Sequence, residues 1–418
     1  MSHHPGSHPG GPSAGGVPGT PRVLRAMNDR AALDLLLAHG PLSRTRIGAL
    51  TGLSKPTASQ LLARLEAAGL VVAGGTSTGR PGPGARLYAL DPRAGYAAGL
   101  DVTPQRIRAA VADITGTVVG AHEVRTSPRR AGDVPAQVAG ALDGAVKEAG
   151  LVRADVHRAV IGTPGAFDPS TGRLRYASHL PGWHSPALLD ELAAALPMPL
   201  GYDNDVNLVA VAERHAGAAR GQEDFVLLWN GEGLGAALVL GGRPHRGFTG
   251  GAGEVGFLPV PGAALARGVS RSGGGGFQTL AGAQELSRLA RESGVTDAPR
   301  GRHSTVAAAL LARAAEDDTG PYGRLLDAYA TRLATGLAAV TAVVDPGLVV
   351  LAGPAIAPGG EPLRRRVASE LHELAASRPR LVLGEVTEHP VARGALESAL
   401  AATRDEVFDT SGRTRPTD

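Results

Sequence analysis

The side chains with the clearest chemistry lie in one short segment. Residues 42–70 read LSRTRIGALTGLSKPTASQLLARLEAAGL. After Ser54, a helix N-cap by type, the apolar residues have the spacing of a buried helical stripe, formed by Ala58, Leu61, Leu62 and Leu65. The same spacing leaves a polar outer face, which carries Lys55, Thr57, Ser59, Gln60 and Arg64. Hydroxyl, amide and basic groups near a helix start can read base edges in the DNA major groove, so the segment predicts a recognition helix.

Two helices are expected before this one. From Val23 onward, apolar side chains recur every three or four residues, at Leu24, Met27, Ala31, Leu35 and Ala38. Ser43 can cap a second helix from Arg44 to Thr51, with Ile47 and Leu50 facing inward. Gly52 permits a left-handed turn into the third helix, and Pro56 is tolerated because first-turn amides have no helical partner. The pattern is that of a helix-turn-helix.

The next segment is typical of a wing. Residues 70–90 read LVVAGGTSTGRPGPGARLYAL, two short β-runs around a turn rich in glycine and proline. Arg80 and Arg86 lie in or beside this turn, where an arginine can enter a narrowed minor groove. The alternative interpretation is an interdomain linker with incidental arginines, and both can hold at once.

Charge is unevenly distributed along the chain. Residues 22–90 carry nine basic and three acidic side chains, a net charge of +6, whereas the whole chain carries +3, so the remainder carries −3. A basic segment attached to a mildly acidic body is typical of a nucleic-acid-binding module. The chain has no cysteine, which excludes disulfides and thiolate metal sites. No long apolar run or leader-like start is present, which predicts a cytoplasmic protein.

Beyond Tyr96 the chain alternates β-like and helical runs, and five motifs occur in the order known from one family. They are GTPGAFDPSTGRLRYASHLPGW at 162–183, YDNDVNLVAVAE at 202–213, GEGLGAALVLGG at 231–242, GFTGGAGEVGFLPV at 247–260 and LAAVTAVVDPGLVVLAGP at 337–354. Over roughly residues 94–400 the chain thus resembles the ROK family of repressors, open reading frames and kinases. The resemblance implies an α/β fold, a two-lobed actin/hexokinase-like (ribonuclease H-like) domain behind the winged helix-turn-helix.

The resulting domain prediction divides the chain into five parts. Residues 1–21 and 404–418 are expected to be disordered tails. The winged helix-turn-helix is expected at 22–90, the first ROK lobe at 91–200, and the second lobe with a closing C-terminal helix at 201–403.

The chain departs from the pattern of the family's kinases where ATP phosphates would bind. Those kinases begin the domain with an acidic residue, two glycines and a threonine, whose small side chains let backbone amides approach the phosphates. This chain has Asp101-Val102-Thr103-Pro104-Gln105 instead. Proline removes an amide donor and the side chains fill the space, so phosphoryl transfer is expected to be lost, with no catalytic residue remaining.

The family's zinc site is also altered. Zinc-binding members use a histidine after the Ala-Gly-Glu segment and a cluster of cysteines, whereas this chain has Phe257 and the loop SRSGGGGFQTLAG at 270–282. No metal and no other cofactor are therefore expected.

The resemblance implies a partly retained sugar pocket. Asn204, Asp205 and Glu254 correspond to sugar contacts, whereas His179, Phe257 and Gln278 replace other polar residues of the family. The predicted effector site is His179, Asn204, Asp205, Glu254 and Gln278. Because unpaired buried polar groups cost about 1–3 kcal/mol each, an ordinary hexose should not bind in the usual way. Either the cleft binds a different carbohydrate or derivative, or ligand control has been lost.

The sequence as a whole predicts a DNA-binding transcriptional regulator, a repressor of carbohydrate-related genes that senses a carbohydrate-type effector. Its expected partners are a double-stranded DNA operator and further copies of itself, as a homodimer or homotetramer, with no membrane. Two alternatives remain: an active ROK sugar kinase with a fused DNA-binding domain, and a ligand-independent DNA-binding regulator.

Overall fold

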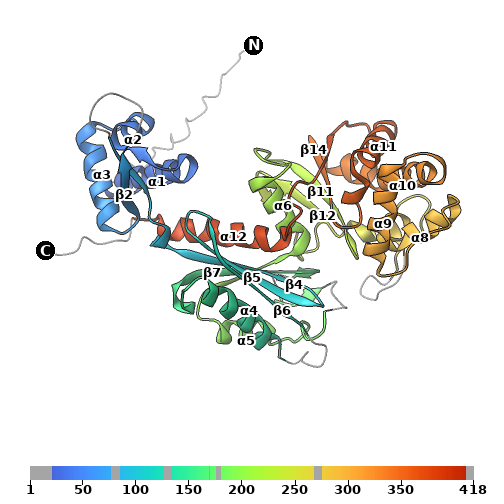
Figure 1. Cartoon of the computed structure of the whole chain (residues 1–418), viewed down its shortest axis with the longest axis horizontal. Helices are drawn as coiled ribbons and strands as arrows, with labels where there is room; N and C mark the ends of the chain where they lie inside the picture. Colours follow the sequence, from blue (N-terminus) through green and yellow to red (C-terminus); the bar gives the residue numbers. More distant parts are fainter. Residues whose placement is uncertain are drawn as a thin grey trace, which may run out of the picture. The chain divides into compact units, whose positions relative to one another are not determined.

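The computed structural model describes residues 21–76, 85–126, 133–168, 170–175, 180–267 and 275–410. The chain divides into two compact units (Figure 1). The smaller unit comprises Met1–Ala94 together with Asp405–Asp418, and the larger unit comprises Gly95–Arg404. Within the described ranges, no helix is long and apolar enough to cross a membrane.

The smaller unit has three helices and a three-stranded sheet of order β1-β3-β2. The elements are α1 (Pro21–His39), β1 (Leu42–Ser43), α2 (Arg44–Thr51), α3 (Lys55–Ala67), β2 (Val71–Thr76) and β3 (Arg86–Leu90), followed by a 3-10 turn, η1 (Pro92–Ala94). Strands β2 and β3 pair antiparallel, as expected for a wing. The turn between them, including Arg80, lies outside the described residues.

Local side-chain chemistry sets the helix boundaries of this unit. The Ser43 hydroxyl accepts a hydrogen bond from the Arg46 amide at the start of α2, and Gly52 ends the helix with φ 72° in the left-handed region. Ser54 caps α3 in the same way, accepting from the Thr57 amide. The predicted stripe of α3 is confirmed, because Ala58, Leu61, Leu62 and Leu65 are all buried.

Two parts of the predicted core of this unit need correction. In α2, Ile47 is fully buried, but Leu50 is 40% exposed rather than inward-facing. In α1, the apolar repeat correctly predicted a helix, but Leu24 and Met27 are exposed. The buried face of α1 is instead formed by Asp29, Ala32, Leu33 and Leu36. Periodicity identifies a helix, but it does not tell which of two apolar stripes the tertiary structure covers.

The end of the chain contributes to the smaller unit. Helix α12 (Pro390–Val407) begins in the larger unit, and its last residues, from Asp405, belong to the smaller one. Val407 and Phe408 are buried, and Asp405 accepts a hydrogen bond from Arg30 at 2.9 Å. The segment 404–418, expected as a disordered tail, is therefore folded up to Thr410 at least, because two apolar side chains among its polar residues join the core.

The larger unit contains two five-stranded sheets. The first has the order β10-β7-β4-β5-β6, with β4 antiparallel to β5 and parallel to β7. Its strands are β4 (Tyr96–Val102), β5 (Arg106–Asp113), β6 (Val118–Arg125), β7 (Val156–Thr163) and β10 (Leu200–Asn204). One face is covered by α4 (Val134–Glu148) and α5 (Leu188–Ala195), which share a core with it. Shorter elements are η3 (Arg153–Asp155), β8 (Ala166–Phe167) and β9 (Leu174–Arg175).

The second sheet has the order β13-β12-β11-β14-β15. Its strands are β11 (Phe225–Asn230), β12 (Leu234–Leu240), β13 (Arg243–Pro244), β14 (Leu348–Ala352) and β15 (Arg380–Leu383). A group of helices packs on its outer face, with which it shares a core: α7 (Gly276–Ala281), α8 (Ala283–Glu292), α9 (His303–Glu316), α10 (Gly320–Val344) and α11 (Gly360–Leu374). The 3-10 turns η4 (Val255–Phe257) and η5 (Ala357–Gly359) lie among them.

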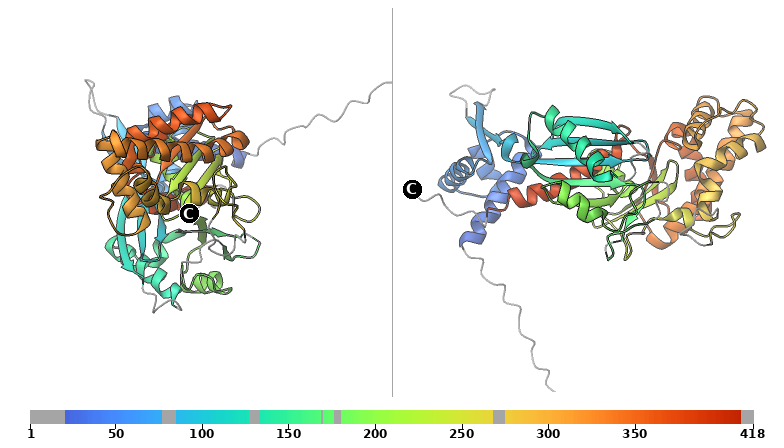
Figure 2. Two further views of the ribbon diagram at one scale, coloured as in Figure 1. Left: turned by 90° about the vertical axis from the view of Figure 1, so that its right-hand side faces the viewer. Right: turned by 90° about the horizontal axis from the view of Figure 1, so that it is seen from below.

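Helices α6 (Asp205–Ala216) and α12 pack between the two sheets. Both share a core with residues of the first and of the second sheet, and Figures 1 and 2 show α12 lying along the first sheet. Two glycines permit this close approach, since an added Cβ would lie 2.3 Å from the Leu396 nitrogen at Gly99 and 1.8 Å from the Leu208 oxygen at Gly394. The expected two-lobed α/β architecture is confirmed, with α6 leading from the end of β10 into this middle layer.

Candidate DNA-binding surface and effector cavity

The outer face of α3 presents three of the predicted DNA contacts to solvent. Lys55, Thr57 and Gln60 are exposed, in the first two turns of the helix. The Thr57 hydroxyl shares a hydrogen bond of 2.8 Å with the Ser54 hydroxyl, so it also supports the N-cap. These side chains have the position and chemistry required for contacts to base edges.

Ser59 is less available than the sequence indicated. Its hydroxyl donates to the Lys55 carbonyl oxygen at 2.9 Å and accepts from Arg44 Nη1 at 3.1 Å. The contact ties α2 to α3 and places the Arg44 guanidinium beside the recognition face. Arg44 was not among the predicted contacts. Its basic side chain at the start of α2, the helix before the recognition helix, was the signal that could have suggested it.

Arg64 is held by an ion pair inside the smaller unit. Its guanidinium pairs with Asp29 of α1, with Nε donating to Oδ2 at 3.2 Å. The Asp29 residue is only 2% exposed, whereas the Arg64 side chain is 42% exposed. Thr410 also donates to this carboxylate, at 3.0 Å. Arg64 therefore links α3 to α1, and its predicted DNA contact would use the exposed part of the same guanidinium.

Arg86 is also paired. At the start of β3, its Nη2 lies 2.9 Å from Glu66 Oε1 of α3, and its guanidinium lies 5.4 Å from the centre of the Tyr88 ring. Both contacts are exposed and leave the side chain accessible to a phosphate. Its role in DNA binding stays a prediction, as does that of Arg80.

The larger unit contains a cavity of about 730 Å³. Four of the predicted effector residues, Asn204, Asp205, Glu254 and Gln278, line it together. The fifth, His179, lies outside the described residues. The structure thus brings together residues separated by up to 74 positions, because the start of α6, the 250–254 segment and α7 all border this cavity.

Asp205 and Glu254 are the two predicted carboxylates that line this cavity. Burial raises the pKa of Asp205 to about 7, and the nearby charges of Asp101 and Glu254 add to the rise, while the Val206 amide, which donates to Oδ1, opposes it. Burial alone raises the pKa of Glu254 to about 7. Within the described residues, no basic side chain forms an ion pair with either. Such carboxyl groups can exchange hydrogen bonds with the hydroxyls of a ligand that displaces water.

The Asn204 side chain makes more hydrogen bonds within the protein than the sequence analysis predicted. It is the N-cap of α6, with Oδ1 accepting from the amides of Val206 at 2.8 Å and Asn207 at 3.3 Å. Its Nδ2 donates to the Gly165 carbonyl oxygen at 2.9 Å. The side chain therefore fixes the start of α6, and with it Asp205, in addition to lining the cavity.

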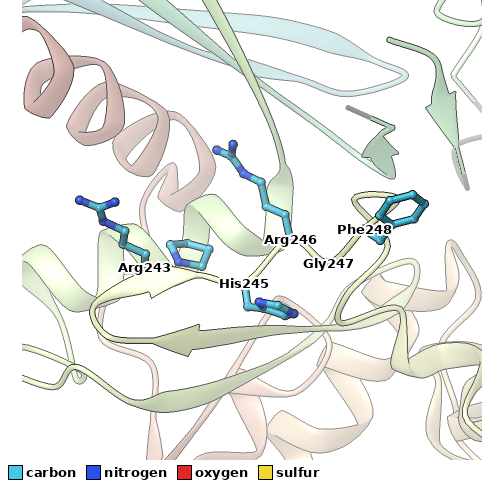
Figure 3. Close-up of a pocket in the computed structure, with 6 residues that line it drawn as sticks. Arg243, His245, Arg246, Gly247 and Phe248 are labelled. Carbon is cyan, nitrogen blue, oxygen red and sulfur yellow. The ribbon is translucent and has the colours of Figure 1, made fainter. Parts of the chain in front are cut away.

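A charged support lies behind Asn204. Asp203 accepts from the Asn204 amide at 2.8 Å and from Asn207 Nδ2 at 3.0 Å, and its other oxygen accepts from Arg246 Nη2 at 2.7 Å. Arg246 lies on the segment after β13, where it points away from His245, beside the highly exposed Phe248 (Figure 3). The Arg246–Asp203 ion pair connects the 245–250 loop to the residue that precedes the cavity-lining Asn204.

Gln278 stabilises a loop rather than offering a free amide. Its Oε1 accepts from the Leu234 amide at 2.7 Å, and its Nε2 donates to Gln284 Oε1 at 2.8 Å. The loop that it holds, residues 231–235, matches the family's second phosphate-type motif. A direct contact of Gln278 with an effector stays a prediction.

The turn at Thr103-Pro104-Gln105 uses its own polar groups. The Thr103 hydroxyl accepts from the Arg106 amide at 3.1 Å, and the Thr103 amide donates to the Arg106 carbonyl oxygen at 2.9 Å. The Gln105 amide also donates to the Thr103 hydroxyl, at 3.4 Å, and Pro104 has no amide hydrogen. This side of the cavity therefore offers no backbone N–H from residues 103–106 to a phosphate.

A polar group in the cavity was missed by the sequence analysis. Glu232, inside the 231–235 loop, accepts a hydrogen bond from the Ser304 hydroxyl and lies 3.5 Å from Arg302 Nε. All three line the cavity. A carboxylate inside a phosphate-type glycine loop was a signal that could have been noticed. Its partners Arg302 and Ser304, about 70 residues later, carried no such signal in the sequence.

Phe257, at the expected position of a zinc ligand, ends the short turn η4. In the parts of the chain that the structure describes, no three histidine, aspartate or glutamate side chains gather as a metal site would require. The absence of zinc stays a prediction.

Known proteins share this architecture. The ROK family model matches residues 97–401, and the MarR family model matches residues 27–80. A glucokinase from Halalkalibacterium halodurans is 26% identical over 291 residues, which cover 67% of this chain and 86% of that protein. A putative xylose repressor from Caldicellulosiruptor sp. is 25% identical over 362 residues, which cover 84% of this chain and 89% of that protein.

A solved structure shows the same overall fold. It is a ROK family transcriptional regulator, a homolog of the E. coli MLC protein, with a TM-score of 0.71 and 18% identity over 93% of this chain and 98% of that chain. The expected combination of winged helix-turn-helix and sugar-kinase-like domain is confirmed by these matches. Since the family model covers most of the residues, the chain belongs to the ROK family, with a MarR-type winged helix in front of its ROK domain.

Proposed function

We propose that this protein is a DNA-binding transcriptional repressor of carbohydrate-related genes, and that its ROK domain senses a carbohydrate-type effector without phosphorylating it. The observation that carries the proposal is the cavity with Asp205 and Glu254, two raised-pKa carboxyl groups with no ion-pair partner among the described residues. Keeping such groups in a cavity costs folding free energy, which a hydroxyl-rich ligand can recover.

Two features argue against kinase activity. The backbone amides of the 103–106 turn donate to acceptors within the turn itself. In the opposite glycine loop, the Glu232 carboxylate would repel the phosphates of a nucleotide. Phosphoryl transfer depends almost wholly on positioning and charge stabilisation, so Asp205 has no phosphoryl donor to act with. Asp205 serves instead as a hydrogen-bonding contact to the effector.

DNA binding is assigned to the smaller unit. Lys55, Thr57 and Gln60 of α3 face solvent, and Arg44 extends the same face toward α2. Arg86 is placed on the wing. A homodimer would present two such surfaces, so the operator is expected to be a pseudo-palindrome with half-sites spaced by whole helical turns. This function places the protein in the cytoplasm, with the chromosome.

The test is an effector titration of the full chain bound to operator DNA, with the operator first isolated by selection from genomic fragments. A sugar that acts through the cavity should change operator affinity by a coupling of about 1–3 kcal/mol, and operator should change sugar affinity by the same factor. Asp205→Asn should abolish the coupling. The matched control is Asp190→Asn, a carboxylate on α5 that does not line the cavity.

Each alternative predicts a distinct result. Turnover of ATP with any of the sugars tested would establish the alternative of an active sugar kinase. Operator binding that no sugar changes, in wild type and Asp205→Asn alike, would establish a ligand-independent regulator. Selection of single asymmetric half-sites would contradict the dimer.

A further inference from the structure

The cavity has a second wall that the proposed sugar contacts leave unused. Its volume of about 730 Å³ lies well inside the range of about 300–1,000 Å³ typical of sites for drug-sized ligands, whereas a single pyranose ring is much smaller. Asn204, Asp205 and Glu254 account for only the part of the lining that comes from α6 and the 250–254 segment. A second wall of the lining includes the end of β11, the residue Pro354 after β14, the 231–235 loop and the start of α9.

An apolar surface lies at the strand ends of this second wall. Trp229 is the second-last residue of β11, and Pro354 follows β14. The two strands are parallel neighbours, so their carboxyl ends share one edge of the sheet. A Cβ at Gly231 would lie 3.0 Å from Trp229 Nε1 and 3.8 Å from Pro354 Cδ, so both rings border this glycine. An indole and a proline ring side by side provide apolar surface with one N–H, suited to the C–H face of a sugar ring.

Polar groups border the same surface. Glu232 accepts from the Ser304 hydroxyl and faces Arg302 at 3.5 Å, and the side chains of the pair are about half exposed, at 46% and 57%. The carboxylate has further lone pairs to accept hydrogen bonds, and the guanidinium has further N–H groups to donate them. Together they can bind neighbouring hydroxyls, which both donate and accept.

The charge of the lining disfavours anionic ligands. Among the described residues that line it, the acidic ones are Asp205, Glu232 and Glu254, and the one basic residue is Arg302. A phosphate would gain one cation and meet up to three carboxylates, so neither a nucleotide nor a sugar phosphate suits the second wall.

We propose that the effector is a neutral disaccharide. It places one ring on Asp205 and Glu254, and the second ring against Trp229 and Pro354 with hydroxyls on Glu232 and Arg302. This assignment rests on the proposed sugar-sensing function and specifies the ligand class of the same cavity. The space that a nucleotide would require for phosphoryl transfer serves here as the subsite for the second ring.

The test is calorimetric titration of the full chain with matched sugars: glucose with maltose and cellobiose, xylose with xylobiose, and glucose 6-phosphate as the anionic probe. In the wild type, the disaccharide of at least one pair should bind about tenfold or more tightly than its monosaccharide, and the phosphate no better than glucose. Glu232→Ala should reduce that ratio toward one while changing monosaccharide affinity by less than about twofold. The control is Glu361→Ala, an exposed acid paired with Arg364 outside the cavity.

A second pair of variants examines the apolar wall. Trp229→Leu should reduce the disaccharide preference, and Trp229→Phe, which keeps an aromatic face, should retain more of it. Because Trp229 is partly buried, the exposed Glu232 remains decisive if Trp229→Leu fails to fold.

The outcomes separate the two proposals. Equal affinity for mono- and disaccharides in the wild type, tighter binding of glucose 6-phosphate, or a preference unchanged in Glu232→Ala would overturn the second-ring subsite while leaving sugar sensing intact. Asp205→Asn should weaken both members of a pair alike. No binding of any sugar in the panel would overturn the subsite, and operator affinity insensitive to sugars in general would overturn sugar sensing with it.

Discussion

The two units of this protein differ in whether their carboxylates form ion pairs. In the smaller unit each acid on helices α1 to α3 has an arginine: Asp29 pairs with Arg64, Asp34 with Arg30, and Glu66 with Arg86. In the cavity of the larger unit, Asp205 and Glu254 have none among the described residues, and burial raises the pKa of both to about 7.

The difference distinguishes acids that hold a surface together from acids that await a ligand. A paired carboxylate is compensated within the chain, so it fixes the position of its arginine. An uncompensated one is destabilising until a ligand arrives, which is why residues with raised pKa values gather at binding sites. Substitutions at Asp29, Asp205, Gln60 and Glu66, with Asp34 and Arg86 for comparison, examine this contrast.

The largest effect is expected at Asp29. Removing one partner of a buried ion pair costs about 3–5 kcal/mol, and because Arg64 is partly exposed we expect roughly 2–4 kcal/mol for Asp29→Ala. Thr410 loses its acceptor in the same variant. Hydrogen exchange of α1–α3 peptides in the full chain measures this local stability. Asp34→Ala, at an exposed pair, should cost less than about 1 kcal/mol; equal losses would show that Asp29 has no special structural role.

Asp205 should have the opposite effect on stability. Its pKa rises from 3.8 in the unfolded chain to about 7 in the folded one, so the folded state binds more protons between these values and stability falls as pH rises from about 4 to about 7. Asp205→Asn lacks this penalty and should become more stable than wild type across that window, by roughly 1–3 kcal/mol at pH 7.5. Denaturant unfolding at pH 4.5, 6 and 7.5 measures the difference. A difference that shrinks with rising pH would contradict the raised pKa.

The third substitution, at Gln60, tests whether the exposed face of α3 reads DNA bases. Gln60→Ala should lose about 1–3 kcal/mol of binding free energy on the operator and little on random DNA, because a base contact acts only on the correct sequence. Competition binding with both DNAs at fixed salt measures it. Equal losses on the two would remove Gln60 from the base-reading residues.

The smallest effect is expected at Glu66. Glu66→Gln removes the charge that competes with DNA phosphate for Arg86, so binding should tighten slightly on all sequences, by less than about 1 kcal/mol. Arg86→Ala should weaken binding on all sequences and reduce the salt slope by about one unit. An unchanged slope in Arg86→Ala would show that this arginine makes no phosphate contact.

The sequence alone was sufficient for features encoded by neighbouring residues. The caps at Ser43 and Ser54, the left-handed Gly52 and the buried stripe of α3 all depend on contacts within a few positions. The altered Thr103-Pro104-Gln105 turn is equally local, since Thr103 itself satisfies the turn's amides. Such interactions leave a periodic or motif-like trace that can be read without the fold.

Only the tertiary structure decided which polar groups meet across the chain. Arg64 was predicted as a free DNA contact, but the fold places it on Asp29, which Thr410 reaches from 381 residues away. Glu232 acquires Ser304 from 72 residues away, and α12 fits between two sheets at Gly99 and Gly394. Pairing of this kind depends on how whole layers pack, and no short-range pattern in the sequence carries that information, so the role of each buried charge became visible only in three dimensions.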